Sequence, residues 1–181
     1  MLIQANNLIG MPIASLEEEK KIGEVTNIIV EISSNNIAKV LGFLVKNKKS
    51  IFSHDLFLSQ IDILDIDIQG ISANSEKSLI NPAEIIRAQK ILQRKFNLIG
   101  LTAIDKFGKK IGKVYSFAIE NKTFQVTKYY VKSFFEERIF DAENVIKIDE
   151  RKIIFANKEK SQKNQIKEPR YAIKKFFTKS Y

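Results

Sequence analysis

Short hydrophobic segments bounded by polar residues recur along the chain. Residues 22–32 and 111–120 are rich in β-branched and aromatic side chains. Both segments are too short and too often interrupted by glycine to make good helices, so the pattern predicts strands. An all-β fold class is therefore expected.

Polar turns separate these predicted strands. Ser-Ser-Asn-Asn at residues 33–36 and Asn-Lys-Lys-Ser at residues 47–50 predict hairpin reversals, because such side chains bond their own backbone and tolerate left-handed geometry. A third reversal, at residues 105–108, places Gly108 where a positive φ is expected. The corresponding residues 16–19, Leu-Glu-Glu-Glu, lack glycine, so this turn is expected to differ in geometry.

The strand pattern occurs twice in the same order. Asn-Leu-Ile-Gly at residues 7–10 returns at residues 97–100, and Lys-Ile-Gly-x-Val at residues 21–25 returns at residues 110–114. The offset falls from 90 to 89 residues between the two motifs, which a one-residue loop deletion explains. The ordered match predicts two strand-rich units that each close on themselves. A single continuous core would contradict this interpretation.

A helix is expected between the two copies, at about residues 82–95. Asn81 can cap it, Pro82 suits its first position, and Glu84 lies in its first turn. Four apolar residues recur at helical spacing, namely Ile85, Ala88, Leu92 and Phe96. We expect this stripe to pack against the chain's own strands rather than against a partner.

The repeated motif resembles the PRC-barrel family. Phe-Gly-Lys-Lys-Ile-Gly-Lys-Val at residues 107–114 looks like that family's glycine-lysine-lysine-isoleucine-glycine-x-valine run, and Glu19 replaces the first of these glycines in the first copy. The resemblance covers residues 7–156. It implies six-stranded barrels used for docking, as in the photosynthetic reaction-centre H subunit and the C-terminal domain of the ribosome maturation factor RimM. Neither of those barrels is catalytic.

This resemblance sets the expected organisation of the chain: two tandem PRC-type β-barrels joined by a short amphipathic helix, with a basic C-terminal tail. The first barrel is expected at residues 1–78, the linker helix at 79–95, the second barrel at 96–157 and the partly disordered or helical tail at 158–181. Gly23 and Gly112 are expected at bends or close backbone approaches rather than at a ligand.

Composition narrows the possible functions of these 181 residues. The absence of cysteine excludes disulfides, thiolate metal sites and cysteine nucleophiles. No apolar run approaches the roughly 20 residues of a membrane span, and the start lacks a targeting pattern, so a soluble cytoplasmic protein is expected. Of the net charge of +9, residues 158–181 hold +6, from eight bases and two acids.

Two patterns imitate catalytic or metal chemistry. Asp65, Asp67, Gln69 and Glu76 nearly reproduce the spacing of a calcium-binding loop, but isoleucines alternate with aspartates here as in a half-exposed strand pair. The only histidine, His54, lies beside Asp55, and adjacency alone is not a catalytic arrangement. No catalytic residue, cofactor or metal site is expected, and the chain is expected not to be an enzyme.

Aromatic residues are the remaining candidates for binding. Five of them cluster in the second copy, where about two are expected to face inward: Tyr129, Tyr130, Phe134, Phe135 and Phe140. The tail interleaves aromatic and basic residues, and its candidate anion- or partner-binding residues are Lys167, Arg170, Tyr171, Lys174, Lys175, Phe176, Phe177 and Lys179. Such a tail suits RNA, an anionic membrane, a protein partner, or simple solvation.

The function expected from these features is that of a PRC-barrel adaptor that docks on a protein partner. Its tail would add attraction to an acidic assembly such as a ribosome or RNA. One alternative is a peripheral protein that docks on anionic lipid through the tail. A second alternative is a small-molecule-binding regulator. Sequence leaves the partner's identity and the oligomeric state open.

Overall fold

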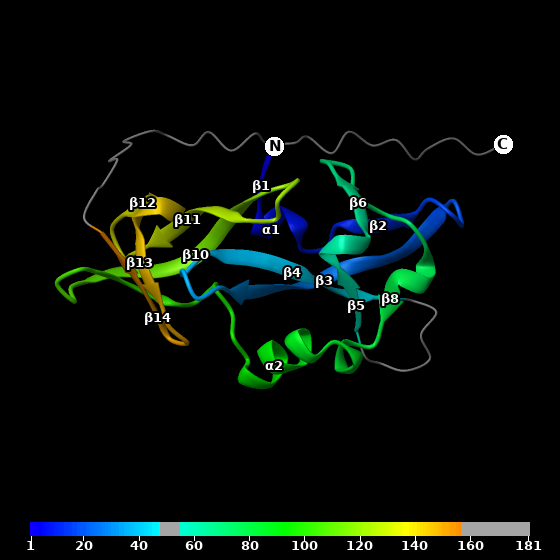
Figure 1. Cartoon of the computed structure of the whole chain (residues 1–181). Coiled ribbons are helices and arrows are strands. Elements are labelled where there is room, and N and C mark those ends of the chain that lie inside the picture. Colours follow the sequence, from blue (N-terminus) through cyan, green and yellow to red (C-terminus); the bar gives the residue numbers. More distant parts are fainter. Residues whose placement is uncertain (48–54, 157–181) are drawn as a thin grey trace.

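The computed structural model describes residues 1–47 and 55–156, most of which lie in strands of two curled sheets (Figure 1). The first sheet has the order β6-β7-β2-β3-β4-β5-β8. Its strands are β2 (Pro12–Ser15), β3 (Lys20–Ile32), β4 (Ala38–Lys46), β5 (Leu56–Ser59), β6 (Ile63–Ile66), β7 (Ile71–Ala73) and β8 (Leu79–Ile80).

The second sheet has the order β12-β11-β10-β9-β14-β13, and β1 (Leu2–Gln4) adds to β10. Its other strands are β9 (Thr102–Asp105), β10 (Lys110–Glu120), β11 (Val126–Lys132), β12 (Glu137–Asp141), β13 (Val145–Ile148) and β14 (Lys152–Phe155). The predicted strands at residues 22–32 and 111–120 are thus confirmed as β3 and β10.

The two copies share one strand order. In each, the first strand pairs antiparallel with the second and in parallel with the last: β2 with β3 and β7, and β9 with β10 and β14. The parallel partners include Ile13 with Ile71 and Ala103 with Ile153. The sequence repeat therefore corresponds to a repeat of topology.

The Asn-Leu-Ile-Gly motif has the same backbone geometry and hydrogen bond in both copies. Gly10 and Gly100 have φ of 81° and 98°, a region that glycine adopts without steric cost. The Gly10 N–H donates to the Val25 carbonyl at 2.8 Å, and the Gly100 N–H donates to the Val114 carbonyl at 2.8 Å. Each motif thus ties the start of its copy to the long strand that follows.

Gly23 and Gly112 allow two backbones to approach, as the sequence predicts. A Cβ on Gly23 would lie 2.4 Å from Val45 Cγ1, and one on Gly112 would lie 2.4 Å from the Lys132 carbonyl oxygen. Real Cβ atoms are not found this close to other heavy atoms. The glycines therefore serve strand packing.

The predicted hairpin at residues 33–36 is confirmed. It joins antiparallel β3 and β4, the Ser33 N–H donates to the Ile37 carbonyl at 3.0 Å, and Asn36 has a φ of 59°. Of the reversal predicted at residues 47–50, only Asn47 lies within the described residues.

The turns at residues 16–19 and 105–108 are more alike than expected. Gly108 has the predicted positive φ, 86°, and the equivalent Glu19 also has a positive φ, 48°. The expectation of a different geometry is wrong at this position. The side chain that fixes each turn differs. Asp105 Oδ1 accepts from the Phe107 and Lys109 N–H groups, whereas Ser15, at the same register position of the first copy, accepts from the Glu18 N–H through Oγ at 3.3 Å.

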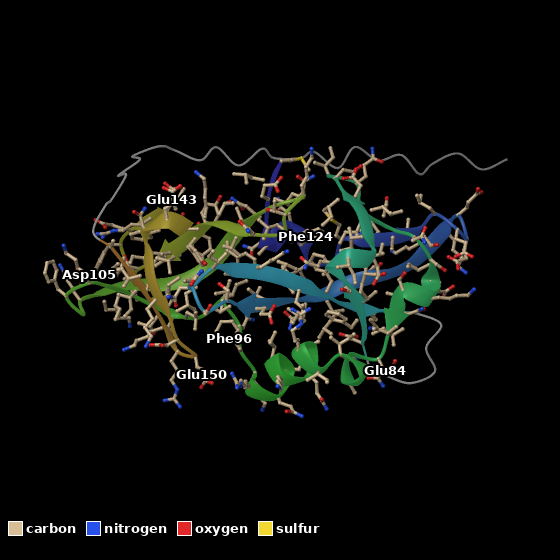
Figure 2. All side chains as sticks on the ribbon, viewed as in Figure 1. Glu84, Phe96, Asp105, Phe124, Glu143 and Glu150 are labelled. Atoms are coloured by element: carbon tan, nitrogen blue, oxygen red, sulfur yellow. The ribbon has the colours of Figure 1, made fainter. Side chains whose placement is uncertain are left out.

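The hydrophobic core runs without a break through both sheets, so the expectation of separate cores is wrong. The sheets meet where β4 and β11 begin: the Val40 N–H donates to the Phe124 carbonyl at 2.9 Å, and Lys39 and Gln125 form a β-bridge. Phe124 is buried between the sheets (Figure 2). Joining the sheets in this way removes from water apolar surface that neither small sheet could cover alone.

Between β8 and β9 the chain forms α2 (Ile86–Arg94), shorter than the expected helix at 82–95. Asn81 and Pro82 begin a separate 3-10 turn (Pro82–Glu84), and extended Ile85 divides it from α2. The stripe does pack on the chain's own strands, because Ala88 is buried with Ile29 and Phe57 on the outer face of the first sheet.

The remaining helical elements are short: α1 (Ala5–Leu8) and 3-10 turns at Gln60–Asp62, Glu76–Ser78 and Ala142–Asn144. None of the helices in the described part of the chain has the length and apolar character that crossing a membrane requires.

Candidate functional site

The tail residues predicted to bind a partner lie outside the described residues. This holds for the whole candidate set: Lys167, Arg170, Tyr171, Lys174, Lys175, Phe176, Phe177 and Lys179. His54 also lies outside them. These predictions stay predictions, and the candidate surface must be sought elsewhere.

The calcium-like spacing belongs to a β-hairpin, which confirms the predicted strand pair. β6 and β7 are antiparallel, and Asp67 Oδ1 accepts from the N–H groups of Gln69 at 2.6 Å and Gly70 at 3.0 Å. Asp67 therefore fixes the turn, as aspartate commonly does. Within residues 1–47 and 55–156, no group of three or more His, Cys, Asp or Glu is placed to hold a metal ion.

Glu18 has the most strongly lowered carboxylate pKa, and its partners are structural. It accepts from the hydroxyl of Ser15, from Ser75 Oγ at 2.9 Å and from the Glu76 N–H at 2.9 Å. The Ser15 bond, followed by the Glu76 N–H, lowers the pKa to about 2. Glu18 thereby fastens the turn at residues 16–19 to the segment after β7.

The aromatic cluster of the second copy divides by burial. Tyr129, Tyr130 and Phe140 are buried, one more than expected, and burial raises the pKa of Tyr129. Phe134 and Phe135 are 99% and 93% exposed in the turn after β11. Core packing is thus the use of three of the five, and two face solvent.

Another turn with an exposed phenylalanine lies at the same end of the second sheet as the turn after β11. Because Lys113 of β10 pairs with Lys132 of β11, the β9–β10 and β11–β12 turns lie at one end. Phe107, in the first of these turns, is 77% exposed, and Lys106 Nζ lies 5.0 Å from its ring centre. We call Lys106, Phe107, Phe134 and Phe135 the phenylalanine tip; Figure 2 marks its location by Asp105.

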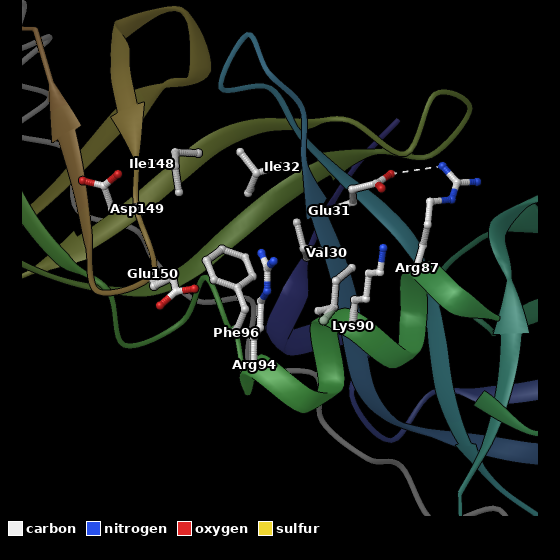
Figure 3. A pocket seen from close by; sticks show the side chains of 11 residues that line it. Val30, Glu31, Ile32, Arg87, Lys90, Arg94, Phe96, Ile148, Asp149 and Glu150 are labelled. Atoms are coloured by element: carbon white, nitrogen blue, oxygen red, sulfur yellow. Dashed lines mark hydrogen bonds and ion pairs between the residues drawn. The ribbon is translucent and has the colours of Figure 1, made fainter. Parts of the chain in front are cut away.

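A groove of about 500 Å³ lies between α2, the end of β3 and the β13–β14 turn (Figure 3). We call it the α2 groove. Its floor is apolar and comes from three separate parts of the chain: Val30, Ile32, Ile91, Phe96 and Ile148. Val30 and Ile148 are buried, and the other three are half-buried.

Charged side chains line the two sides of the α2 groove. Arg87, Lys90 and Arg94 project from α2, while Glu31 comes from β3 and Asp149 and Glu150 come from the β13–β14 turn (Figure 3). Arg87 pairs with Glu31 at 3.3 Å, and Asp149 pairs with Lys147 at 3.0 Å. Lys90 and Arg94 are exposed, and no ion pair to either is found among the described residues.

Sequence reasoning missed the α2 groove but could have found its cationic side. Arg87, Lys90 and Arg94 are spaced by three and four residues, which places them on one helical face. The floor gave no such signal, because Val30, Phe96 and Ile148 are far apart in the sequence. Only the packing of both sheets brings them together.

No protein-family model matches the sequence, and no curated protein matches it either. The resemblance to the PRC-barrel family therefore depends on the repeated sequence motif.

Proposed function

We propose that the chain is a non-enzymatic adaptor of the PRC-barrel type that docks a protein partner in the α2 groove. The observation that carries this proposal is the combination of an apolar floor with exposed cations along one wall, of which Lys90 and Arg94 have no ion pair within residues 1–47 and 55–156. Apolar area provides affinity on binding, and flanking charges select the partner.

The barrel part of the proposal has support of its own. Because the two sheets share one continuous core, the two units do not close separately. We take each set of six strands as one PRC-type unit of a joined pair, since both sets have the same order and the same parallel pairing of β2 with β7 and of β9 with β14. The glycine motif of the family lies at a close strand approach in both copies. The proposal extends the family's docking habit to this chain by analogy.

A protein segment suits the α2 groove better than a small molecule. Arg87 and Arg94 are two helical turns apart, roughly 10 Å at the rise of an α-helix. The Arg87 side chain is 68% exposed, so the cationic wall faces solvent instead of converging on an enclosed ligand. An extended ligand would use the full length of this wall.

Site-specific photo-crosslinking tests this docking site. A photoreactive residue at Glu150, on the rim of the α2 groove, is expected to label a defined partner in extracts of the source cell. The same residue at Lys122, an exposed position in the β10–β11 turn, is the positional control. We expect Lys90→Glu with Arg94→Glu to reduce the labelling at least tenfold.

The charge-matched control for that experiment is Lys113→Glu with Lys122→Glu, which changes net charge equally on exposed residues that do not line the α2 groove. The control should retain the crosslink. Equal labelling from positions 150 and 122, or equal loss in both double variants, would refute docking in the α2 groove.

The phenylalanine tip favours a second candidate function, docking on an anionic membrane surface. Exposed aromatic rings beside lysine suit the interface between headgroups and acyl chains. Phe134→Ser with Phe135→Ser should then reduce co-sedimentation with phosphatidylserine vesicles at least fivefold. Ile61→Ser with Ile68→Ser, two isoleucines of the first copy that are each 83% exposed, should not. Equal sedimentation of wild type and both variants would remove this candidate.

A further inference from the structure

The two long strands β3 and β10 are equivalent, but among the described residues only β10 has a strand on both edges of its C-terminal half. Ala118 and Ile119 of β10 pair with β11 on one edge and with β1 on the other. Glu120 pairs with Leu2 of β1, and its N–H donates to the Gln125 carbonyl in the turn before β11. The offset of 89 residues makes Ile29, Val30 and Glu31 their counterparts in β3. Within the described residues, these three pair with β4 alone.

A helix lies in the first copy near the place that β1 takes in the second. The residues 90 positions after β1 are 92–94, the last turn of α2. A helix satisfies its backbone groups internally, so it cannot supply the hydrogen bonds that β1 gives to β10. α2 packs on the outer face of the first sheet and leaves the edge of β3 facing the α2 groove.

The ends of the two sites also correspond. Asn36, in the β3–β4 turn, donates to the Ile146 carbonyl at 3.3 Å and accepts from the Ile148 N–H at 3.1 Å, beside the α2 groove. Asn121, in the β10–β11 turn, donates to the Ile66 carbonyl at 3.4 Å, and its own N–H donates to the Met1 carbonyl beside β1. Each long hairpin thus reaches an edge strand of the other sheet.

We propose that the α2 groove accepts an extended segment of a partner protein as an added strand on residues 29–31 of β3. This proposal rests on the proposed docking function and specifies how the partner binds. In this proposal the partner segment pairs with β3 in the α2 groove as β1 pairs with β10 in the second sheet. Strand addition gives affinity through backbone hydrogen bonds and specificity through alternate side chains.

The charges of the α2 groove define the added segment. Its inward side chains would be apolar, since Val30 is buried and Ile32 half-buried beside it. Carboxylates would face Lys90 and Arg94 of α2, whereas the tail of this chain, with a net charge of +6, would bring like charge to both. Asp149 and Glu150 on the other side of the α2 groove would repel further carboxylates, so an extended segment with alternating apolar residues and Asp or Glu on the side that faces α2 fits best.

The test begins with a phage-displayed library of random dodecapeptides selected on the full-length protein. Enriched sequences should alternate apolar residues with Asp or Glu. Their affinity should fall at least tenfold on Lys90→Glu with Arg94→Glu and stay unchanged on Lys113→Glu with Lys122→Glu. N-methylation of alternate peptide amides should also reduce affinity at least tenfold, and methylation of the intervening amides should not.

Amide hydrogen exchange in residues 29–31 separates the outcomes. Binding should slow this exchange at least tenfold. Some peptides could require Lys90 and Arg94 for binding, yet tolerate N-methylation and leave the exchange of residues 29–31 unchanged. That result would overturn strand addition and keep the docking function. If no peptide is enriched, or binding ignores the α2 groove, both proposals fail. Full protection in the free protein would show that a segment of the chain itself pairs with β3, which also overturns a partner strand.

Discussion

At the scale of the residue, Glu18 couples the fold to pH. Its pKa of about 2 in the folded chain lies below the ordinary 4.5, because the Ser15 hydroxyl and the Glu76 N–H stabilise its charged form. A depressed pKa contributes stability that is present above about pH 4.5 and is lost as the pH falls toward 2.

Glu18→Gln is therefore expected to flatten the pH dependence of the unfolding free energy between pH 5 and 2. Urea denaturation at several pH values in this window measures the effect. Glu17→Gln is the control. Glu17 is the exposed neighbour of Glu18, and its substitution should leave the slope as in the wild type. A slope in Glu18→Gln equal to that of the wild type would contradict the proposed role of the carboxylate.

Glu19 and Gly108 make a second test at this scale, because both have positive φ. A left-handed conformation costs a non-glycine residue about 1–2 kcal/mol, and the entropy of glycine in the unfolded chain offsets about 0.5–1 kcal/mol. Glu19→Gly should thus raise the unfolding free energy by about 0.5–1 kcal/mol, and Gly108→Ala should lower it by about 1 kcal/mol. Thermal and urea unfolding measure both effects, with Lys109→Ala as the control substitution in the same turn. A lower unfolding free energy for Glu19→Gly than for the wild type would contradict the argument.

At the scale of the element, the hairpin turns join the two sheets through Asn36 and Asn121. A hydrogen bond of this kind contributes about 0.5–1.5 kcal/mol. Asn121→Ala should lower the unfolding free energy by about 1 kcal/mol. Asn36→Ala also leaves alanine at a φ of 59° and should lower it by about 2 kcal/mol. Asn35→Ala changes an exposed neighbour in the first turn and should have little effect. Equal unfolding free energies for Asn35→Ala and Asn36→Ala would show that the contact across the sheets contributes nothing.

The elements that sequence predicts best are those whose own residues determine them. β3 and β10 contain β-branched runs, and the β3–β4 turn contains Ser33 and Asn36, so local propensity suffices. β1 and β8 are too short to give a periodic pattern and depend on pairing with distant strands. The start of α2 was misplaced because Asn81 and Pro82 suit a 3-10 turn as well as a helix.

At the scale of the whole molecule, duplication produces two equivalent strand orders with unequal surroundings. The segment before the first copy becomes β1 and pairs with the second sheet, whereas the segment before the second copy becomes α2 and packs on the first sheet. The sequence repeat predicts the strand order that the two copies share. The α2 groove arises from the difference, because it joins Val30, Lys90 and Ile148 from three parts of the chain.

The most direct test of the docking account is hydrogen exchange of the full-length protein with and without its crosslinked partner or a selected peptide. Protection is expected in residues 29–32, 86–96 and 148–150, which border the α2 groove. Exchange at the phenylalanine tip, residues 105–109 and 133–136, should stay unchanged. Protection confined to the phenylalanine tip, with unchanged exchange around the α2 groove, would contradict the account.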